Sequence, residues 1–329
     1  MKEKILKLLK ESSNEFVSGQ KISEELGVSR AAIWKHINVI KEEGYEIQAI
    51  SRKGYKVISS PDILTFEEIR NFINTKYIGQ NILHYDSIGS TNSKAKELAE
   101  AGCAHGTVVI SEEQTSGRGR LGRNWVSPKY KGIWMSIILR PNITTQNASQ
   151  ITLIGAAAAQ KAIMKMGVKT SIKWPNDIVI NGKKVCGILT EMSGEIDHIN
   201  YLVMGIGINV NLDAEDIPTE LKDVATSLKL ESGKFMDRKL LVANILNIFE
   251  ELYYDFVENG NIKETIDVCR KNSMLLGKEI QLVSRGEIRI AKAISISDAG
   301  ELLVENEQGI IEYIVSGEVS IRGMYGYSK

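Results

Sequence analysis

Three short helices in close succession at the start of the chain constrain its fold more than any other feature of the sequence. The first is predicted by a stripe of apolar residues, Ile5, Leu6, Leu8 and Leu9. Ser18 can cap a second helix that ends at Gly27, and Ser29 can cap a third. Residues at positions i, i+4 and i+7 mark the buried side of that third helix, and they are Ile33, Ile37 and Ile40.

A basic hairpin follows the third helix. Residues 45–57 (YEIQAISRKGYKV) alternate apolar and polar side chains about a turn expected at Lys53 and Gly54. Three helices and a hairpin in this order are typical of a winged helix-turn-helix, with the helix-turn-helix at about residues 19–38. The side chains expected to contact DNA are Arg30, Trp34, Lys35, Asn38, Arg52 and Lys53. A small protein-interaction module with a solvated polar face is the alternative, which an exposed Trp34 disfavours.

The charge balance limits how the chain can bind nucleic acid. Lys and Arg number 41 and Asp and Glu number 41, so the formal net charge is zero and a general polyanion binder is excluded. Residues 1–60 carry eleven basic and eight acidic residues, a surplus of three. One unit of this kind offers few phosphate contacts and should bind DNA weakly, so we expect two copies to act together.

Pro61, after two serines, marks a domain boundary, and helices and strands then alternate from about residue 64 to residue 270. Strands are predicted at residues 107–111, 132–139, 178–180, 185–191 and 201–210, and helices at 150–166 and 238–257. Tight turns such as Asn181-Gly182 join several strands. The pattern therefore indicates an α+β fold, a mixed or antiparallel sheet with helices packed on it.

A second positive region lies between Glu113 and Asp177, where the sequence has no acidic residue. Ten basic residues intervene, namely Arg118, Arg120, Arg123, Lys129, Lys131, Arg140, Lys161, Lys165, Lys169 and Lys173. Mutual repulsion makes such a run unfavourable unless it binds an anionic ligand. The alternative explanation is that these residues form salt bridges with acids elsewhere in the chain.

Three of these arginines lie in a glycine-rich loop at residues 114–125 (QTSGRGRLGRNW). Its G-x-G-x-x-G spacing does not indicate a dinucleotide site, because no acidic residue follows about twenty positions later to bind a ribose hydroxyl. Backbone amides and guanidinium groups suit a loop that closes over phosphate or carboxylate oxygens. A flexible basic surface loop is the alternative.

Two charged residues in a predicted hairpin are candidates for acyl-phosphate chemistry. Lys184 begins a strand, so a sheet holds its ammonium group, which can bring together a carboxylate and an α-phosphate. Asp177, in the segment KWPND, is the first acidic residue after the positive region and a candidate ligand of Mg²⁺. Ordinary hairpin charges explain both residues equally well.

Two further segments can contact a polar ligand. Ser90, Thr91 and Asn92 precede a predicted helix and offer hydroxyls, an amide and a helix N-terminus, although simple N-capping explains them equally well. Residues 205–209 (GIGIN) end an apolar strand with two glycines, which lets a ligand approach the backbone. Asn209 is then placed to bond a base or a ribose.

These motifs together make the chain similar to a known family. It resembles the bifunctional biotin protein ligases that double as biotin operon repressors, from about residue 1 to the C-terminus. The matching segments, in order, are GVSRAAIWKHI, STN, QTSGRGRLGRNW, KWPND, KKVCGILTE, GIGINVN and GEVSIRG. The resemblance implies a winged helix-turn-helix at residues 1–62, a biotin ligase domain with a central mixed sheet at 63–272, and a small SH3-like β-barrel at 273–329.

The resemblance also implies a reaction and its residues. Biotin and ATP, with Mg²⁺, give biotinyl-5′-AMP and pyrophosphate, and biotin then passes to a lysine of a biotin carboxyl carrier protein. The implied biotin-binding residues are Ser90, Thr91, Asn92, Gln114, Arg118, Gly119, Arg120 and Lys184, of which Arg118, Arg120 and Lys184 are also implied as catalytic. The implied ATP-binding residues are Arg120, Arg123, Asn176, Asp177 and Asn209, with Asp177 also the Mg²⁺ ligand. A tryptophan that some members place near adenine has no counterpart in residues 224–228.

The expected partners are the carrier protein and operator DNA, the latter bound by a homodimer that biotin, as effector, promotes. Two rivals are a non-catalytic biotin-sensing regulator and a lipoate-type ligase, which would need a roomier apolar pocket. No stretch approaches the ~20 apolar residues that span a bilayer, and the start is amphipathic, so we expect a cytoplasmic protein with no membrane partner. Three distant cysteines support neither a disulfide framework nor a zinc ribbon.

Overall fold

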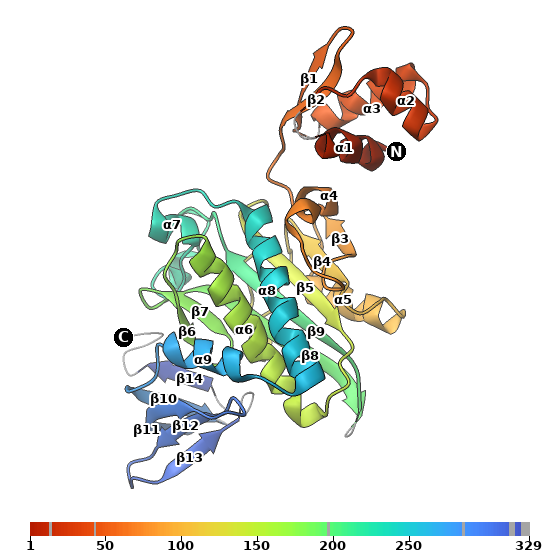
Figure 1. Cartoon of the computed structure of the whole chain (residues 1–329). Helices are drawn as coiled ribbons and strands as arrows, with labels where there is room; N and C mark the ends of the chain where they lie inside the picture. Colours follow the sequence, from red (N-terminus) through yellow and green to blue (C-terminus); the bar gives the residue numbers. More distant parts are fainter. Residues whose placement is uncertain (13–14, 43, 196–197, 285–286, 316–319, 324–329) are drawn as a thin grey trace. The chain divides into compact units, whose positions relative to one another are not determined.

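The computed structural model describes residues 1–12, 15–42, 44–195, 198–284, 287–315 and 320–323. The chain forms two compact units, Met1–Asn71 and Phe72–Lys329 (Figure 1). Among the described residues, no helix is long and apolar enough to cross a membrane.

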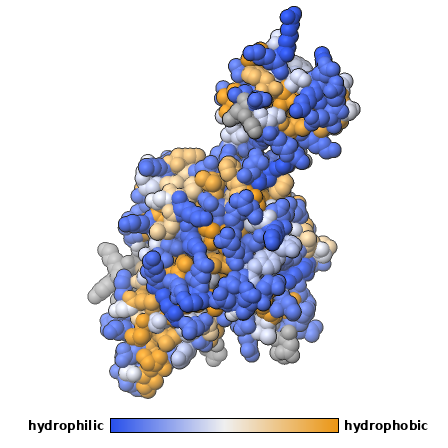
Figure 2. Space-filling view, viewed as in Figure 1, coloured by the Kyte–Doolittle hydropathy of each residue, from blue (hydrophilic) through white to orange (hydrophobic). Residues whose placement is uncertain are grey.

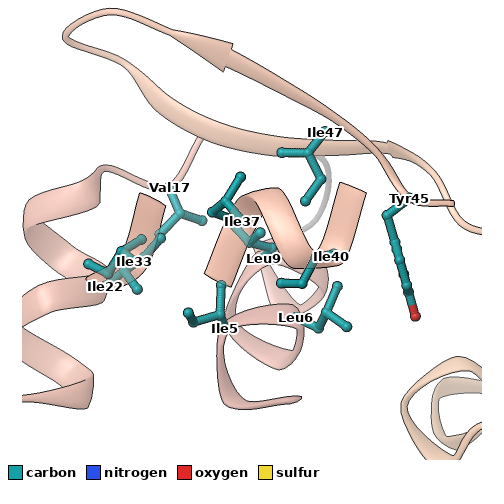
Figure 3. Packing of buried hydrophobic residues seen from close by; sticks show 10 residues of the cluster. All are labelled: Ile5, Leu6, Leu9, Val17, Ile22, Ile33, Ile37, Ile40, Tyr45 and Ile47. Carbon is teal, nitrogen blue, oxygen red and sulfur yellow. The ribbon is translucent and has the colours of Figure 1, made fainter. Parts of the chain in front are cut away.

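The first unit is a winged helix-turn-helix. Its elements are α1 (Lys2–Glu11), α2 (Gly19–Leu26), α3 (Arg30–Glu42), β1 (Glu46–Ile50), β2 (Gly54–Ser59) and the short helix α4 (Phe66–Ile69). Figure 3 shows its buried core, made of Ile5, Leu6, Leu9, Val17, Ile22, Ile33, Ile37, Ile40, Tyr45 and Ile47. Ser18 Oγ accepts a hydrogen bond from the Lys21 amide at 3.1 Å. Ser29 Oγ accepts one from the Ala32 amide at 3.3 Å, so both predicted caps are confirmed.

The turn of the wing differs from the sequence prediction. The turn is made by residues 51–53, with a left-handed φ of 67° at Arg52, so Lys53 lies in it as predicted but Gly54 already begins β2. Gly54 is needed for another reason. A β-carbon there would lie 2.0 Å from the Val17 carbonyl oxygen, so glycine lets β2 approach the chain before α2.

Residues after Pro61 pack within the first unit. Glu68 of α4 is buried and accepts a hydrogen bond from the Tyr45 hydroxyl at 2.5 Å. Lys10 of α1 forms an ion pair with the same carboxylate. A carboxylate withdrawn from water needs such partners, and these tie α4 to the helices and the wing.

The second unit is built on a mixed seven-stranded sheet with the order β3-β4-β5-β9-β8-β7-β6. Its strands are β3 (Ile82–Tyr85), β4 (Val108–Ser111), β5 (Gly132–Leu139), β6 (Ser171–Lys173), β7 (Asp177–Ile180), β8 (Lys183–Glu195) and β9 (His198–Asn209). β3 and β4 are parallel and the other neighbours antiparallel, which confirms the predicted mixed sheet. Positive φ angles of 48° at Asn181 and 78° at Gly182 form the predicted two-residue turn.

Helices cover both faces of this sheet. They are α5 (Thr91–Glu100), α6 (Ala148–Lys165), α7 (Leu228–Ser232), α8 (Arg238–Asn259) and α9 (Lys263–Lys271). A β-carbon at Gly155 of α6 would meet the Met204 sulfur at 2.6 Å. One at Gly205, the next residue of β9, would meet Asn92 of α5 at 2.1 Å. Because neighbouring strand residues point to opposite faces, α5 lies on one face and α6, with α8 beside it, on the other (Figure 1).

The C-terminal strands form an antiparallel sheet with the order β13-β12-β11-β10-β14, consistent with the predicted SH3-like domain. They are β10 (Glu279–Ser284), β11 (Glu287–Ile296), β12 (Leu302–Glu305), β13 (Ile311–Ile314) and β14 (Ser320–Gly323). Of the motif GEVSIRG, residues 317–319 lie outside the described residues. Trp174 Nε1 donates to the Gly300 carbonyl at 2.9 Å and fastens this sheet to the larger one. Its exposed large apolar or aromatic side chains include Ile288, Ile290, Ile311 and Tyr313. Figure 2 shows hydrophobic surface gathered on this sheet.

Candidate functional site

A cavity of about 480 Å³ opens on the α5 face of the seven-stranded sheet. Every residue that the sequence suggested for biotin or ATP lines it: Ser90, Thr91, Asn92, Gln114, Arg118, Gly119, Arg120, Arg123, Asn176, Asp177, Lys184 and Asn209. They come from the start of α5, the loop at residues 114–125, the turn between β6 and β7, the start of β8 and the end of β9. The fold therefore places a polar tripeptide, an arginine loop and a lysine around one ligand-sized space.

Hydroxyls and amides form one part of the cavity wall. Ser90 caps α5, which begins at Thr91 and not after Asn92 as the sequence suggested. The Thr91 backbone amide donates to Gln114 Oε1 at 2.8 Å. Gln114 Nε2 donates to Ser127 Oγ at 2.9 Å, so both amide atoms of Gln114 are fixed in place.

Asn92 is held by three partners on two strands, β8 and β5. Its Nδ2 donates to Glu191 Oε2 at 2.7 Å and to the Leu189 carbonyl at 3.2 Å, and its Oδ1 lies 2.7 Å from Ser136 Oγ. Lys96 Nζ donates to the other oxygen of Glu191 at 2.7 Å. Burial raises the pKa of Glu191, but hydrogen bonds from Lys96 and Asn92 outweigh burial and lower the pKa overall. The carboxylate is therefore ionised at neutral pH.

Lys184 lies at the start of β8 with its ammonium group inside the cavity. Its Nζ is 2.6 Å from Asp177 Oδ1 and 5.1 Å from the centre of the Trp125 ring. A β-carbon at Gly187 would lie 2.9 Å from this Nζ, so glycine leaves the room in which the lysine side chain lies. Burial raises the pKa of the adjacent Cys186 thiol far above its usual range, which makes it a poor nucleophile.

A hydrogen bond ties the arginine loop to another segment of the cavity lining. Arg120 Nη1 donates to Asn176 Oδ1 at 2.8 Å, which links the loop to the KWPND turn. Within the loop, the Gly119 amide donates to the Arg123 carbonyl at 2.7 Å. Arg118 and Arg123 also line the cavity, so the loop supplies three arginines to the space that Lys184 lines.

Trp125, at the end of the loop, is a cavity residue that sequence reasoning missed. Gly187 and Gly207 pair across β8 and β9, and a β-carbon on them would approach the Trp125 ring to 3.0 Å and 2.7 Å. Its Nε1 is buried with no hydrogen-bond partner in the part of the chain that the structure describes. The two glycines were the available signal, since they make a flat floor on which an aromatic ring can lie.

The positive region at residues 114–176 does not form one anion site. Arg118, Arg120, Arg123 and Lys173 line the cavity. Four other members are satisfied elsewhere: Lys129 pairs with Asp86, Lys131 with Asp213, Lys161 with Glu264, and Arg140 donates to backbone carbonyls of Ala99, Cys103 and Asn200. For the three lysines the salt-bridge alternative is correct, because the fold brings acids to them from other segments, while Arg140 is satisfied by backbone carbonyls instead.

The cavity offers few groups for a metal ion. In the described ranges, no three His, Cys, Asp or Glu side chains are grouped so that they could hold one. Asp177 supplies one carboxylate, in contact with Lys184. Such a donor set fits Mg²⁺ held mainly by the phosphates of a nucleotide, since this ion often takes only one or two protein carboxylates. Asn209 uses Nδ2 to donate to the Thr226 carbonyl at 3.0 Å.

The first unit exposes the side chains predicted to contact DNA. Trp34 on α3 is 61% exposed, although it is among the largest apolar side chains of the protein. The others are Arg30, Lys35, Arg52 and Lys53, which are exposed, and Asn38, which is half-buried. An aromatic ring and basic groups on α3 and the wing are the features with which such a unit reads a groove and its phosphates.

Three family models match the chain in the order of its parts. They are the HTH domain at residues 2–56, the Biotin/lipoate A/B protein ligase family at 85–209 and the Biotin protein ligase C terminal domain at 275–322. Among solved structures, the biotin protein ligase from Aquifex aeolicus in complex with biotin and ATP is 34% identical, with a TM-score of 0.66, over 74% of this chain and 99% of that one. The class of protein is therefore a biotin protein ligase that also carries a helix-turn-helix domain.

Whole-length relatives narrow the class. The bifunctional ligase/repressor BirA of Bacillus subtilis is 42% identical over 98% of both chains. The protein of the same name from Escherichia coli is 29% identical over 97% of this chain and 96% of its own length. The chain therefore belongs to the family of bifunctional biotin protein ligase/repressors.

Proposed function

We propose that this protein is an ATP-dependent biotin protein ligase that forms biotinyl-5′-AMP and passes biotin to a lysine of a biotin carboxyl carrier protein. The observation that carries the proposal is Lys184, whose ammonium group shares one cavity with a polar network and an arginine loop. The polar network suits the ureido ring of biotin, and the arginines suit its carboxylate and the phosphates of ATP.

The reaction has two balanced steps. A carboxylate oxygen of biotin attacks the α-phosphorus of ATP, and the bond to pyrophosphate breaks. Both reactants are anionic, so Lys184, Arg118 and Arg120 act by supplying positive charge where they meet. A neutral lysine amine of the carrier then attacks the acyl carbon, AMP leaves, and the amine loses a proton. A loop tied across the cavity by Arg120 keeps water from the mixed anhydride.

The remaining residues sort by the chemistry that they offer. For biotin we propose Ser90, Thr91, Asn92, Gln114, Arg118, Gly119, Arg120 and Lys184. For ATP we propose Arg120, Arg123, Asn176, Asp177 and Asn209. Trp125 is proposed to stack on adenine, because its half-buried ring lies beside Lys184 and no tryptophan occurs in residues 224–228. Mg²⁺, held by Asp177 and the phosphates, would offset phosphate charge.

The whole proposal is tested by incubating the protein with biotin, ATP, Mg²⁺ and a biotin carboxyl carrier domain. Mass spectrometry should show one biotinyl group added to the carrier, with pyrophosphate released. Lipoate in place of biotin should leave the carrier unmodified, because lipoate has no ureido ring to satisfy the hydroxyls and amides of the polar network. Biotin binding without pyrophosphate release would instead identify a non-catalytic regulator.

The same chain is proposed to repress transcription as a dimer. The exposed surface of α3 and the wing supports operator binding, and the small number of basic groups on one unit supports the need for two. We propose domain limits of 1–62, 63–272 and 273–329, within which the matched families fall, with α4 as a linking segment that packs on the first unit. The adenylate is proposed as the ligand that promotes dimerisation.

Replacing Trp34 with alanine should lower operator affinity about tenfold without changing ligase activity, because its exposed ring contributes little to the core. Fluorescence anisotropy with operator DNA, with and without biotin plus ATP, measures the effect. Val39→Ala, an exposed apolar change on α3 away from Trp34, is the matched control.

Sedimentation of the parent protein should show self-association only when biotin and ATP are present. A monomer under every condition would contradict the dimer model.

A further inference from the structure

A chain of hydrogen bonds runs beneath the polar wall of the cavity and ends at Thr91. It starts at Lys96 and Glu191, passes through Asn92 to Ser136, and reaches the Thr91 hydroxyl 2.8 Å from Ser136 Oγ. Ser136 is fully buried and Asn92 and Thr91 nearly so. Burial limits the alternative partners of these groups, so the hydrogen-bond inventory of each one can be followed along the chain of bonds.

The donor and the acceptor of each hydrogen bond follow from the two groups that can only accept, the Glu191 carboxylate and the Leu189 carbonyl. Asn92 presents one amide atom to Glu191 and to the Leu189 carbonyl, and both of these only accept, so that atom is the NH₂ group. The amide oxygen therefore faces Ser136, which must donate its single hydrogen to it. The 2.8 Å contact between Ser136 and Thr91 is then donated by Thr91.

Thr91 thus uses its hydroxyl hydrogen inside the wall. The other acceptor within reach, Gln114 Oε1, is farther away at 3.1 Å and already accepts the Thr91 backbone amide. The hydroxyl oxygen consequently presents lone pairs to the cavity. An acceptor at this point favours a ligand ring that carries N–H groups, as a cyclic urea does, over one that carries none.

We propose that Glu191, held by Lys96, is a specificity-determining positioning residue that makes Thr91 an acceptor for a ring N–H of the substrate. This inference rests on the proposed function. Glutamine at position 191 would keep its oxygen toward the Lys96 ammonium and turn its NH₂ toward the NH₂ of Asn92. Two donors cannot face each other, so the order of the hydrogen bonds would be lost. If Asn92 flips, its oxygen meets the Leu189 carbonyl and Ser136 must donate to Thr91, which releases the Thr91 hydrogen to Gln114 Oε1 or to the cavity. Thr91 would then no longer be fixed as an acceptor.

The test is Glu191→Gln in the full chain, with binding measured by calorimetry. The ligands are biotin and an analogue in which a ring N–H is replaced by oxygen. Affinity for biotin should fall about 10–100-fold, while the preference for biotin over the oxygen analogue collapses. Affinity for ATP should stay unchanged. Glu195→Gln, an exposed change on the same strand, should match the parent protein.

Lys96→Met distinguishes the effect of the Lys96 charge from the effect of the hydrogen-bond direction that Glu191 sets. It leaves the carboxylate in place, so the preference for the N–H ligand should persist even if binding weakens. Thermal unfolding of each variant checks the fold. An unchanged preference in a folded Glu191→Gln protein, or its loss in a folded Lys96→Met protein, would overturn the inference. Failure of the parent protein to bind biotin would instead remove the proposed function.

Discussion

Lys184→Ala should slow formation of the adenylate by about 10²–10³-fold while the protein stays folded. The ammonium group lies 2.6 Å from Asp177 and lines the cavity beside three arginines, so it contributes charge that no other group at that point replaces. Without this ammonium group, the repulsion between the biotin carboxylate and the α-phosphate of ATP is offset by less positive charge. The fold should tolerate the change because Lys184 is not part of the apolar core. Pyrophosphate release from biotin and ATP, followed in a single turnover, measures the step.

A matched control lies one residue away. Lys183 is in the same strand, but its Nζ donates to the Lys222 carbonyl outside the cavity, so Lys183→Ala should keep nearly full activity. Transfer from chemically prepared biotinyl-5′-AMP should be slowed less in Lys184→Ala than adenylate formation. Full adenylate formation by Lys184→Ala would exclude this lysine from the mechanism.

The fold was largely predictable because its signals are local. Helix caps at Ser18 and Ser29 and the turn at Asn181 and Gly182 depend on residues within a few positions, and each is confirmed. Gly54 was misassigned to the wing turn because a glycine is required there by close contact with the Val17 backbone, more than thirty residues earlier in the chain. A glycine indicates a backbone requirement but not whether that requirement is a turn or a close contact.

The residues that line the cavity could be predicted where they lie in sequence motifs. The partners of the basic residues could not, because those partners come from distant segments of the chain. The positive region at residues 114–176 has no acids in sequence, yet Asp213 and Glu264 reach Lys131 and Lys161 in the folded chain. Trp125 and Glu191 were missed for a related reason. Trp125 lies against glycines of two strands, and Glu191 bonds an amide on α5, so only the folded sheet with its helix brings these groups together.

Gly205→Ala should abolish measurable biotin binding, a loss of at least about 100-fold. A β-carbon at this position would lie 2.1 Å from Asn92 Oδ1 and 2.9 Å from its Cγ, so the Asn92 side chain would have to leave the wall. The bonds to Glu191, Leu189 and Ser136 would break together, leaving buried polar groups unpaired. Stability should fall by about 2–4 kcal/mol. Calorimetry and thermal unfolding measure the two effects.

A double variant shows whether the clash is the cause. Asn92→Ala removes the group that the new methyl would strike, so Gly205→Ala added to Asn92→Ala should cost much less stability than it costs in the parent protein. Biotin binding should stay lost, because the polar wall is still incomplete. Gly19→Ala, where a β-carbon meets only Tyr55 at 3.7 Å, should be harmless. Equal losses of stability in both backgrounds would show that Gly205 matters for another reason than its contact with Asn92.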